Sequence, residues 1–88
     1  MIALQIKKTT YKITKVHTVG STLHGAELVG PRGGIIWIHC FSNGSVRLVN
    51  MNRSGMPYQS VDLWDNEAES VRQTLNEARS GDRLVAHH

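Results

Sequence analysis

The clearest hydrophobic pattern lies between residues 33 and 53, where two runs rich in β-branched and aromatic residues flank Asn43-Gly44. Asn-Gly between two such runs predicts a β-hairpin, because a type I′ turn needs positive φ at both central residues. A two-residue turn sets Ile38 opposite Val49 and gives one aliphatic face, which we expect to be core: Ile36, Ile38, Val49 and Met51. The same register gives a mixed aromatic face on the other side: Trp37, His39, Phe41, Val46 and Leu48.

Before this hairpin, three segments are rich in strand-forming residues. Alternating apolar positions from Ile2 to Ile6 predict a first strand, and residues 9–19 and 24–30 predict two more. Neither face of residues 9–19 is cleanly apolar, which indicates an edge strand or a bulged strand. At an edge, Lys12 and Lys15 would discourage aggregation between sheets.

Turn residues dominate two connections. Residues 30–34 predict a tight turn that exposes Arg32, and they lack the Lys-Ser/Thr ending of a phosphate-binding loop. Residues 52–57 interrupt the strand pattern a second time. Residues 59–63 either add a short strand or cross to the next element, and the sequence leaves both open.

The C-terminal part of the chain predicts one amphipathic helix. Asn66 is a favourable N-cap, and Glu69 three residues later completes a capping box. Gly81 predicts the end of the helix. The apolar stripe is narrow and recurs every three or four residues: Ala68, Val71, Leu75 and Ala78. His87 and His88 form a tail to which we assign no role.

These elements predict an α+β fold, with an antiparallel sheet of four or five strands and one C-terminal helix packed on one face. A small SH3-like barrel with the helix appended is the alternative. The 88 residues predict a single domain, 1–88, because a chain of this length buries only about 60–65% of its unfolded surface. So small a core leaves room for a homodimer that adds stability.

Composition indicates the cellular compartment in which such a domain works. No apolar run reaches the ~18 residues that a membrane span requires, so we expect no membrane partner. The first lysines follow the apolar N-terminal residues, which is the reverse of a signal peptide. A single cysteine, Cys40, excludes an internal disulfide and is typical of a reducing compartment, so we expect a cytoplasmic protein.

Charge is distributed unevenly along the chain. Residues 1–53 carry seven basic residues and one acid, a net charge of +6, whereas residues 54–88 carry three basic residues and six acids, a net charge of −3. Such a distribution can steer association with a polyanion, or with an acidic protein surface, through the basic half. Mutual neutralisation of the two halves within the fold explains the asymmetry equally well.

The residues that could support catalysis or bind a metal ion do not form a catalytic or metal-binding motif. Cys40 and His39 are neighbours in a strand and point to opposite faces, so they cannot form a dyad with each other. The histidines at positions 17, 24 and 39 lack the spacing of a zinc site. These histidines and the basic residues could supply the base, the acid and the phosphate-binding group of a small ribonuclease toxin. Any protein rich in both residue types offers such a combination, so the signal is not specific. We therefore expect a protein that is not an enzyme and needs neither cofactor nor metal.

The preferred functional hypothesis is protein binding. Both faces of the predicted hairpin are apolar enough to require burial, but only one helix with a narrow apolar stripe is available. An apolar patch near arginines should therefore stay exposed. Exposed apolar patches of this kind mark partner sites. By size and architecture the chain resembles small accessory proteins of phages and plasmids, some of which, such as anti-CRISPR proteins, block a large host nucleoprotein complex. The resemblance implies occlusion of a larger protein or nucleoprotein complex. The expected partner-binding residues are Trp37, His39, Phe41, Arg47, Arg32, Lys12, Lys15, Tyr58 and Trp64.

A basic nucleic-acid-binding domain is the alternative. Trp37, His39 and Phe41 alternate along one strand, and bases stack on such aromatic platforms. The basic half of the chain supplies positive charge for phosphates. One observation separates the two hypotheses: an exposed aromatic row beside the lysines favours nucleic acid, whereas a row buried beneath the helix favours a protein partner.

Overall fold

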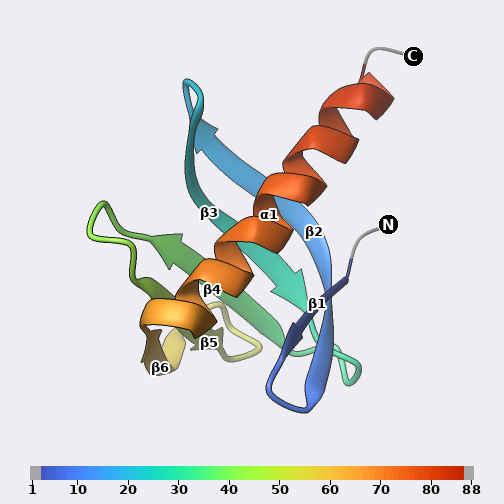
Figure 1. Cartoon of the computed structure of the whole chain (residues 1–88). Helices are drawn as coiled ribbons and strands as arrows, with labels where there is room; N and C mark the ends of the chain where they lie inside the picture. Colours follow the sequence, from blue (N-terminus) through green and yellow to red (C-terminus); the bar gives the residue numbers. More distant parts are fainter. Residues whose placement is uncertain (1–2, 87–88) are drawn as a thin grey trace.

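A computed structural model describes the backbone of residues 3–86 and the side chains of residues 3–79. Six strands precede one helix: β1 (Ala3–Ile6), β2 (Thr9–Val19), β3 (Thr22–Val29), β4 (Ile35–Cys40), β5 (Val46–Met51), β6 (Pro57–Leu63) and α1 (Asp65–Ala86). Each strand pairs antiparallel with the next, in the order β1-β2-β3-β4-β5-β6. The sheet curves around α1, which crosses it diagonally (Figure 1). Ile2, His87 and His88 lie outside the described residues.

The α+β class is confirmed, but the strand number is six, not four or five. Residues 57–63, which the sequence left open, do form a strand, and the predicted segments 2–6 and 9–19 correspond to β1 and β2, which are joined by a tight turn at Lys7-Lys8. Lys7 has a left-handed backbone there, with φ of 56°, a conformation that Gly or Asn usually signals. Within residues 3–86, β1 and β6 are the two edges of an open sheet, so the strands form half of a barrel and not the closed SH3-like barrel of the alternative.

The β4–β5 turn occurs at the predicted place but with a different geometry. The Gly44 N–H donates to the Phe41 carbonyl at 3.1 Å, and the Phe41 N–H donates to the Ser45 carbonyl at 2.9 Å. Of the two predicted turn residues, only Gly44 has positive φ, 93°. The Asn43 side-chain oxygen instead accepts a hydrogen bond from the Ser45 N–H at 2.9 Å. This is the three-residue loop with a glycine bulge rather than the two-residue type I′ turn.

The change of turn shifts the hairpin register by one residue. Ile38 lies opposite Leu48, not Val49. Because side chains alternate between the two sides of a strand, this shift moves every β5 side chain to the side opposite the predicted one. The predicted faces are therefore wrong for β5, and the buried set of the hairpin is Ile36, Ile38, Val46 and Leu48.

The core lies between α1 and one side of the sheet. All four residues of the predicted helical stripe are buried: Ala68, Val71, Leu75 and Ala78. The helix starts at Asp65, one residue before the predicted N-cap, and continues beyond Gly81 to Ala86. The predicted end at Gly81 is wrong, because a glycine inside a helix costs only about 1 kcal/mol and does not force a stop. In the described part of the chain, no helix has the length and apolarity needed to cross a membrane.

Strand β2 is an interior strand, flanked by β1 and β3. The expectation that Lys12 and Lys15 lie on an edge strand and discourage aggregation is therefore wrong. The predicted bulge is confirmed, since the β2–β3 register shifts between Ile13 and Lys15 and again between His17 and Thr18. The first shift reverses the alternation of side chains. Ile13 is consequently buried on the helix side, whereas Lys15 and His17 lie on the opposite side of the sheet.

Candidate nucleic-acid interface

Within residues 3–86, no helix covers the side of the sheet that faces away from α1. Trp37 on β4 pairs with Glu27 on β3 and with Val49 on β5, and paired residues share a side of the sheet. The neighbours of Trp37 in the chain, Ile36 and Ile38, are buried on the helix side. We call the uncovered side the open face. It includes Lys12, Lys15, His17, Glu27, Ile35, Trp37, His39, Arg47, Val49 and Met51.

Three of the predicted site residues form a row along β4 and into its turn. Trp37 is 41% exposed and Phe41 is 40% exposed, and His39 is exposed between them. Alternate residues of a strand are about 6.8 Å apart, so the row spans about 14 Å. The Arg47 guanidinium carbon lies 5.2 Å from the centre of the Phe41 ring, within cation–π range. The rings are therefore accessible, and one end of the row carries a guanidinium.

Lys12 and Lys15 lie on the same side of the sheet as this row. Lys15 pairs with Glu27, which in turn pairs with Trp37. The two strand spacings between Lys15 and Trp37 amount to roughly 10 Å. Both lysines are exposed, so a polyanion lying across the aromatic row would come within their reach.

Among residues 3–79, each acid of the open face is paired with a basic side chain. Arg47 donates to the two carboxylate oxygens of Asp62 at 2.7 and 3.3 Å. This hydrogen bonding raises the pKa of Arg47 and lowers the pKa of Asp62. His17 Nε2 lies 2.9 Å from Glu27 Oε2. Counting Lys12, Lys15 and Arg47 against Asp62 and Glu27, with the histidines neutral, 3 − 2 leaves the open face with a net charge of +1.

Sequence reasoning missed His17 and Glu27 as members of this surface. Simple alternation along residues 9–19 assigns His17 to the same side as Tyr11 and Ile13. The bulge between Ile13 and Lys15 moves His17 to the open face instead. No turn or glycine signal in the sequence specifies where this bulge falls; the pairing with β3 does.

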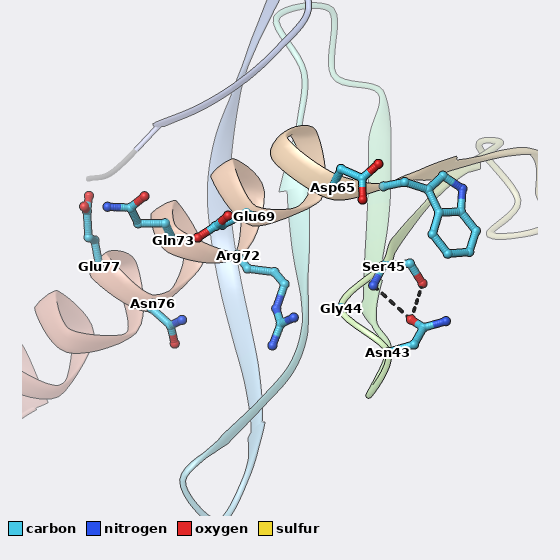
Figure 2. A pocket seen from close by; sticks show the side chains of 10 residues that line it. Asn43, Gly44, Ser45, Asp65, Glu69, Arg72, Gln73, Asn76 and Glu77 are labelled. Atoms are coloured by element: carbon cyan, nitrogen blue, oxygen red, sulfur yellow. Dashed lines mark hydrogen bonds between the residues drawn. The ribbon is translucent and has the colours of Figure 1, made fainter.

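The other three predicted site residues are not part of the row. Arg32 is exposed in the β3–β4 connection, and Tyr58, exposed on the edge strand β6, borders a shallow recess that also includes His39 and Arg47. Trp64 lines an open groove of about 1100 Å³ between α1 and the β4–β5 turn (Figure 2). The rest of that groove is mostly polar and acidic: Asn43, Gly44, Ser45, Asp65, Glu69, Arg72, Gln73, Asn76 and Glu77. The nine predicted residues therefore do not form one surface, although six of them share the open face.

Potential nucleophiles and metal ligands are dispersed. Residues 3–79 contain no group of three or more His, Cys, Asp or Glu side chains arranged to hold a metal ion. Cys40 lies opposite Val46 on the helix side, whereas His39 is on the open face. Burial raises the pKa of the Cys40 thiol, and Arg72 offsets only part of this. The thiol is therefore protonated at neutral pH and is not an activated nucleophile.

Comparison with known proteins assigns neither a family nor a structural relative: no family model, no curated protein and no solved structure matches the chain. Functional inference therefore depends on the chemistry of the surfaces. The feature that stands out is the row of aromatic side chains on a sheet face that α1 leaves uncovered.

Proposed function

We propose that the protein binds single-stranded nucleic acid on the open face. The observation that supports this function is the exposed row of Trp37, His39 and Phe41 on the same side of the sheet as Lys12 and Lys15. Bases stack on aromatic side chains presented by a sheet, and lysines neutralise the phosphates. Exposure of this row is the observation that separates the two sequence-based hypotheses, and it favours nucleic acid over a protein partner.

The geometry favours a single strand over a duplex. Bases in a duplex stack on one another, so the rings of a sheet reach base faces only in unpaired strands. Successive side chains of the row are about 6.8 Å apart, twice the ~3.4 Å rise per nucleotide of a stacked strand. A bound strand is therefore unstacked, with its bases against the rings. Every base has a face that can stack, so sequence preference should be weak.

The two tryptophans provide a matched pair of variants for the test. Fluorescence anisotropy of a labelled single-stranded oligonucleotide should show about tenfold weaker binding for Trp37→Ala, since one stacked base contributes roughly 1–3 kcal/mol. Trp64→Ala removes an equally large ring that is also exposed, but from the far groove, and it should leave the affinity unchanged. Equal effects of the two substitutions would contradict binding on the open face.

Salt dependence provides a second test. If Lys12 and Lys15 each neutralise one phosphate, the logarithm of the binding constant should fall against the logarithm of salt concentration with a slope of about −1.4. The double variant Lys12→Gln/Lys15→Gln should flatten this slope, whereas replacing both lysines by arginine should retain it. An affinity that does not change with salt would exclude phosphate contacts.

A second candidate is the protein-binding function, because the β6 region exposes a run of large apolar side chains: Met56, Tyr58, Val61 and Trp64. Exposed apolar residues along an edge strand often mark a partner site. The alternative proposal is a non-catalytic inhibitor that occludes a larger protein or nucleoprotein complex, as anti-CRISPR proteins do. In a DNA-cleavage assay with a purified CRISPR effector complex, the protein should inhibit cleavage and Tyr58→Ala should relieve inhibition. Cleavage at the same rate with and without the protein would contradict this for that complex.

We assign either function to the cytoplasm, because the single cysteine, Cys40, is a free thiol. Self-association through the exposed β6 region would give a homodimer, and sedimentation equilibrium would detect it as twice the mass of the chain.

A further inference from the structure

Three connections at one end of the sheet form a basic rim. The β1–β2, β3–β4 and β5–β6 connections lie at the same end, because successive antiparallel strands alternate in direction (Figure 1). These connections contain no acid, and they carry four exposed basic side chains, which we call the loop-end rim: Lys7, Lys8, Arg32 and Arg53. The β2–β3 and β4–β5 turns at the other end contain no charged residue. Positive charge is therefore concentrated at one end of the strands.

A cleft of about 440 Å³ opens at this end, and its lining includes Tyr11, Tyr58, Arg32 and the buried Ile36. A Cβ atom on Gly30 would lie 3.3 Å from the Tyr11 ring, so the glycine lets this ring lie close against the β3–β4 connection. The cleft volume is within the range of roughly 300–1,000 Å³ that small ligands occupy. Tyrosine rings and a guanidinium are groups that stack on bases and bind phosphates.

The cleft borders the open face at the loop end, although Tyr11 and Ile36 place part of its lining on the helix side of the sheet. Ile35 and Met51, which lie at the loop end of the open face, also line the cleft. Tyr58 lines both the cleft and a shallow recess of the open face that includes His39 and Arg47. A strand that follows the aromatic row along β4 toward the loop end therefore reaches the border of the cleft, and its last nucleotide enters the cleft by passing around the end of the sheet.

We infer that this cleft takes the terminal nucleotide of a bound single strand, with its base against the tyrosines and its terminal phosphate on Arg32. The inference rests on the proposed function. A phosphate monoester carries a charge of about −1.5 to −2 at neutral pH, whereas an internal phosphodiester carries a single negative charge. A rim with four basic side chains and no acid therefore favours the end of a strand over an internal position.

The test compares a linear oligonucleotide carrying a terminal phosphate with a circular one of the same sequence. In fluorescence anisotropy, the wild-type protein should bind the linear strand about tenfold more tightly, the contribution of one additional stacked base. Arg32→Gln should reduce the affinity for the linear strand to that for the circle. Arg53→Gln is the matched control: it removes an equal charge from the loop-end rim but outside the cleft lining, and it should keep the preference for the linear strand.

Trp37→Ala distinguishes failure of this inference from failure of the proposed function. It should weaken binding of the linear and circular strands by the same factor, because Trp37 lies on the open face. Equal binding of the two strands by the wild-type protein overturns the end site and leaves the proposed function intact. Equal loss of preference in Arg32→Gln and Arg53→Gln also overturns the end site, since total charge would explain it. Binding that Trp37→Ala leaves unchanged overturns the proposed function instead.

Discussion

The two sides of the sheet are built from the same strands, yet they differ in exposure and in the role that we assign to them. On β4, Ile36 and Ile38 are 6% and 2% exposed beneath α1, whereas Ile35 and Trp37 are 43% and 41% exposed on the open face. Apolar character along β4 does not distinguish the two sides. The two sides differ because α1 covers only one of them: a single helix with one narrow apolar stripe can bury only one side of a sheet. Substitutions on the two sides should therefore separate stability from binding.

The largest effect on stability is expected on the helix side. Leu75 is fully buried between α1 and the sheet, and Leu75→Ala should lower the free energy of unfolding by about 2–5 kcal/mol, because it leaves a cavity. Trp37→Ala on the open face should lower it by about 1 kcal/mol or less. Urea denaturation followed by circular dichroism measures both. A larger loss of stability for Trp37→Ala than for Leu75→Ala would reverse the comparison between the two sides.

An intermediate effect is expected where two backbones approach closely. A Cβ atom at Gly25 of β3 would collide with the Ile38 carbonyl oxygen, so Gly25→Ala should force β3 and β4 apart and cost about 1–3 kcal/mol. Gly34→Ala is the control, because a Cβ atom there meets no neighbour within 4 Å. The temperatures of thermal unfolding of the two variants provide the measurement. Similar temperatures would show that β3 and β4 do not make this close contact.

The smallest effect is expected from the exposed Arg47–Asp62 pair on the open face. Hydrogen bonding from Arg47 lowers the pKa of Asp62. A pKa that is lower in the folded than in the unfolded chain stabilises the fold above the unfolded value of about 3.9, and this stabilisation is lost as pH falls through the folded value. Asp62→Asn should remove this part of the acid sensitivity below about pH 4 and change stability little at neutral pH.

Urea denaturation midpoints across the acidic range test this prediction. The wild-type midpoint should fall more steeply with decreasing pH than that of Asp62→Asn. An identical fall in the two proteins would mean that the pair makes no contribution to the stability of the open face.

Local sequence patterns predicted elements well where neighbouring residues carry the signal. The helical stripe through Leu75 is buried as expected, and the β4–β5 turn lies at Asn43-Gly44. The sequence separated the strands before and after residues 7–8 but carried no turn signal there, because Lys7 adopts the left-handed conformation without being glycine or asparagine. The opposite error occurred at Gly81. A glycine there predicts the end of the helix, but it lies inside the continuous helix α1.

The aromatic row was predictable, but its exposure was not. Alternation along β4 fixes Trp37 and His39 on one side of the strand. In the predicted register this side also held Val46 and Leu48, which made it resemble a second core. The bulge at Gly44 moves these two residues to the helix side and leaves the aromatic row uncovered.

By itself the sequence determined an antiparallel sheet, one amphipathic helix and an aromatic row along a strand, because each depends on residues close together in the chain. Only the tertiary structure decided that α1 covers the other side, that Lys15 and His17 join the face of Trp37, and that Tyr58 borders a cleft at the loop end. These features depend on pairing between strands distant in sequence. Their register is set by burial across the whole sheet, and one extra residue in a turn or a bulge reverses which side chains face solvent.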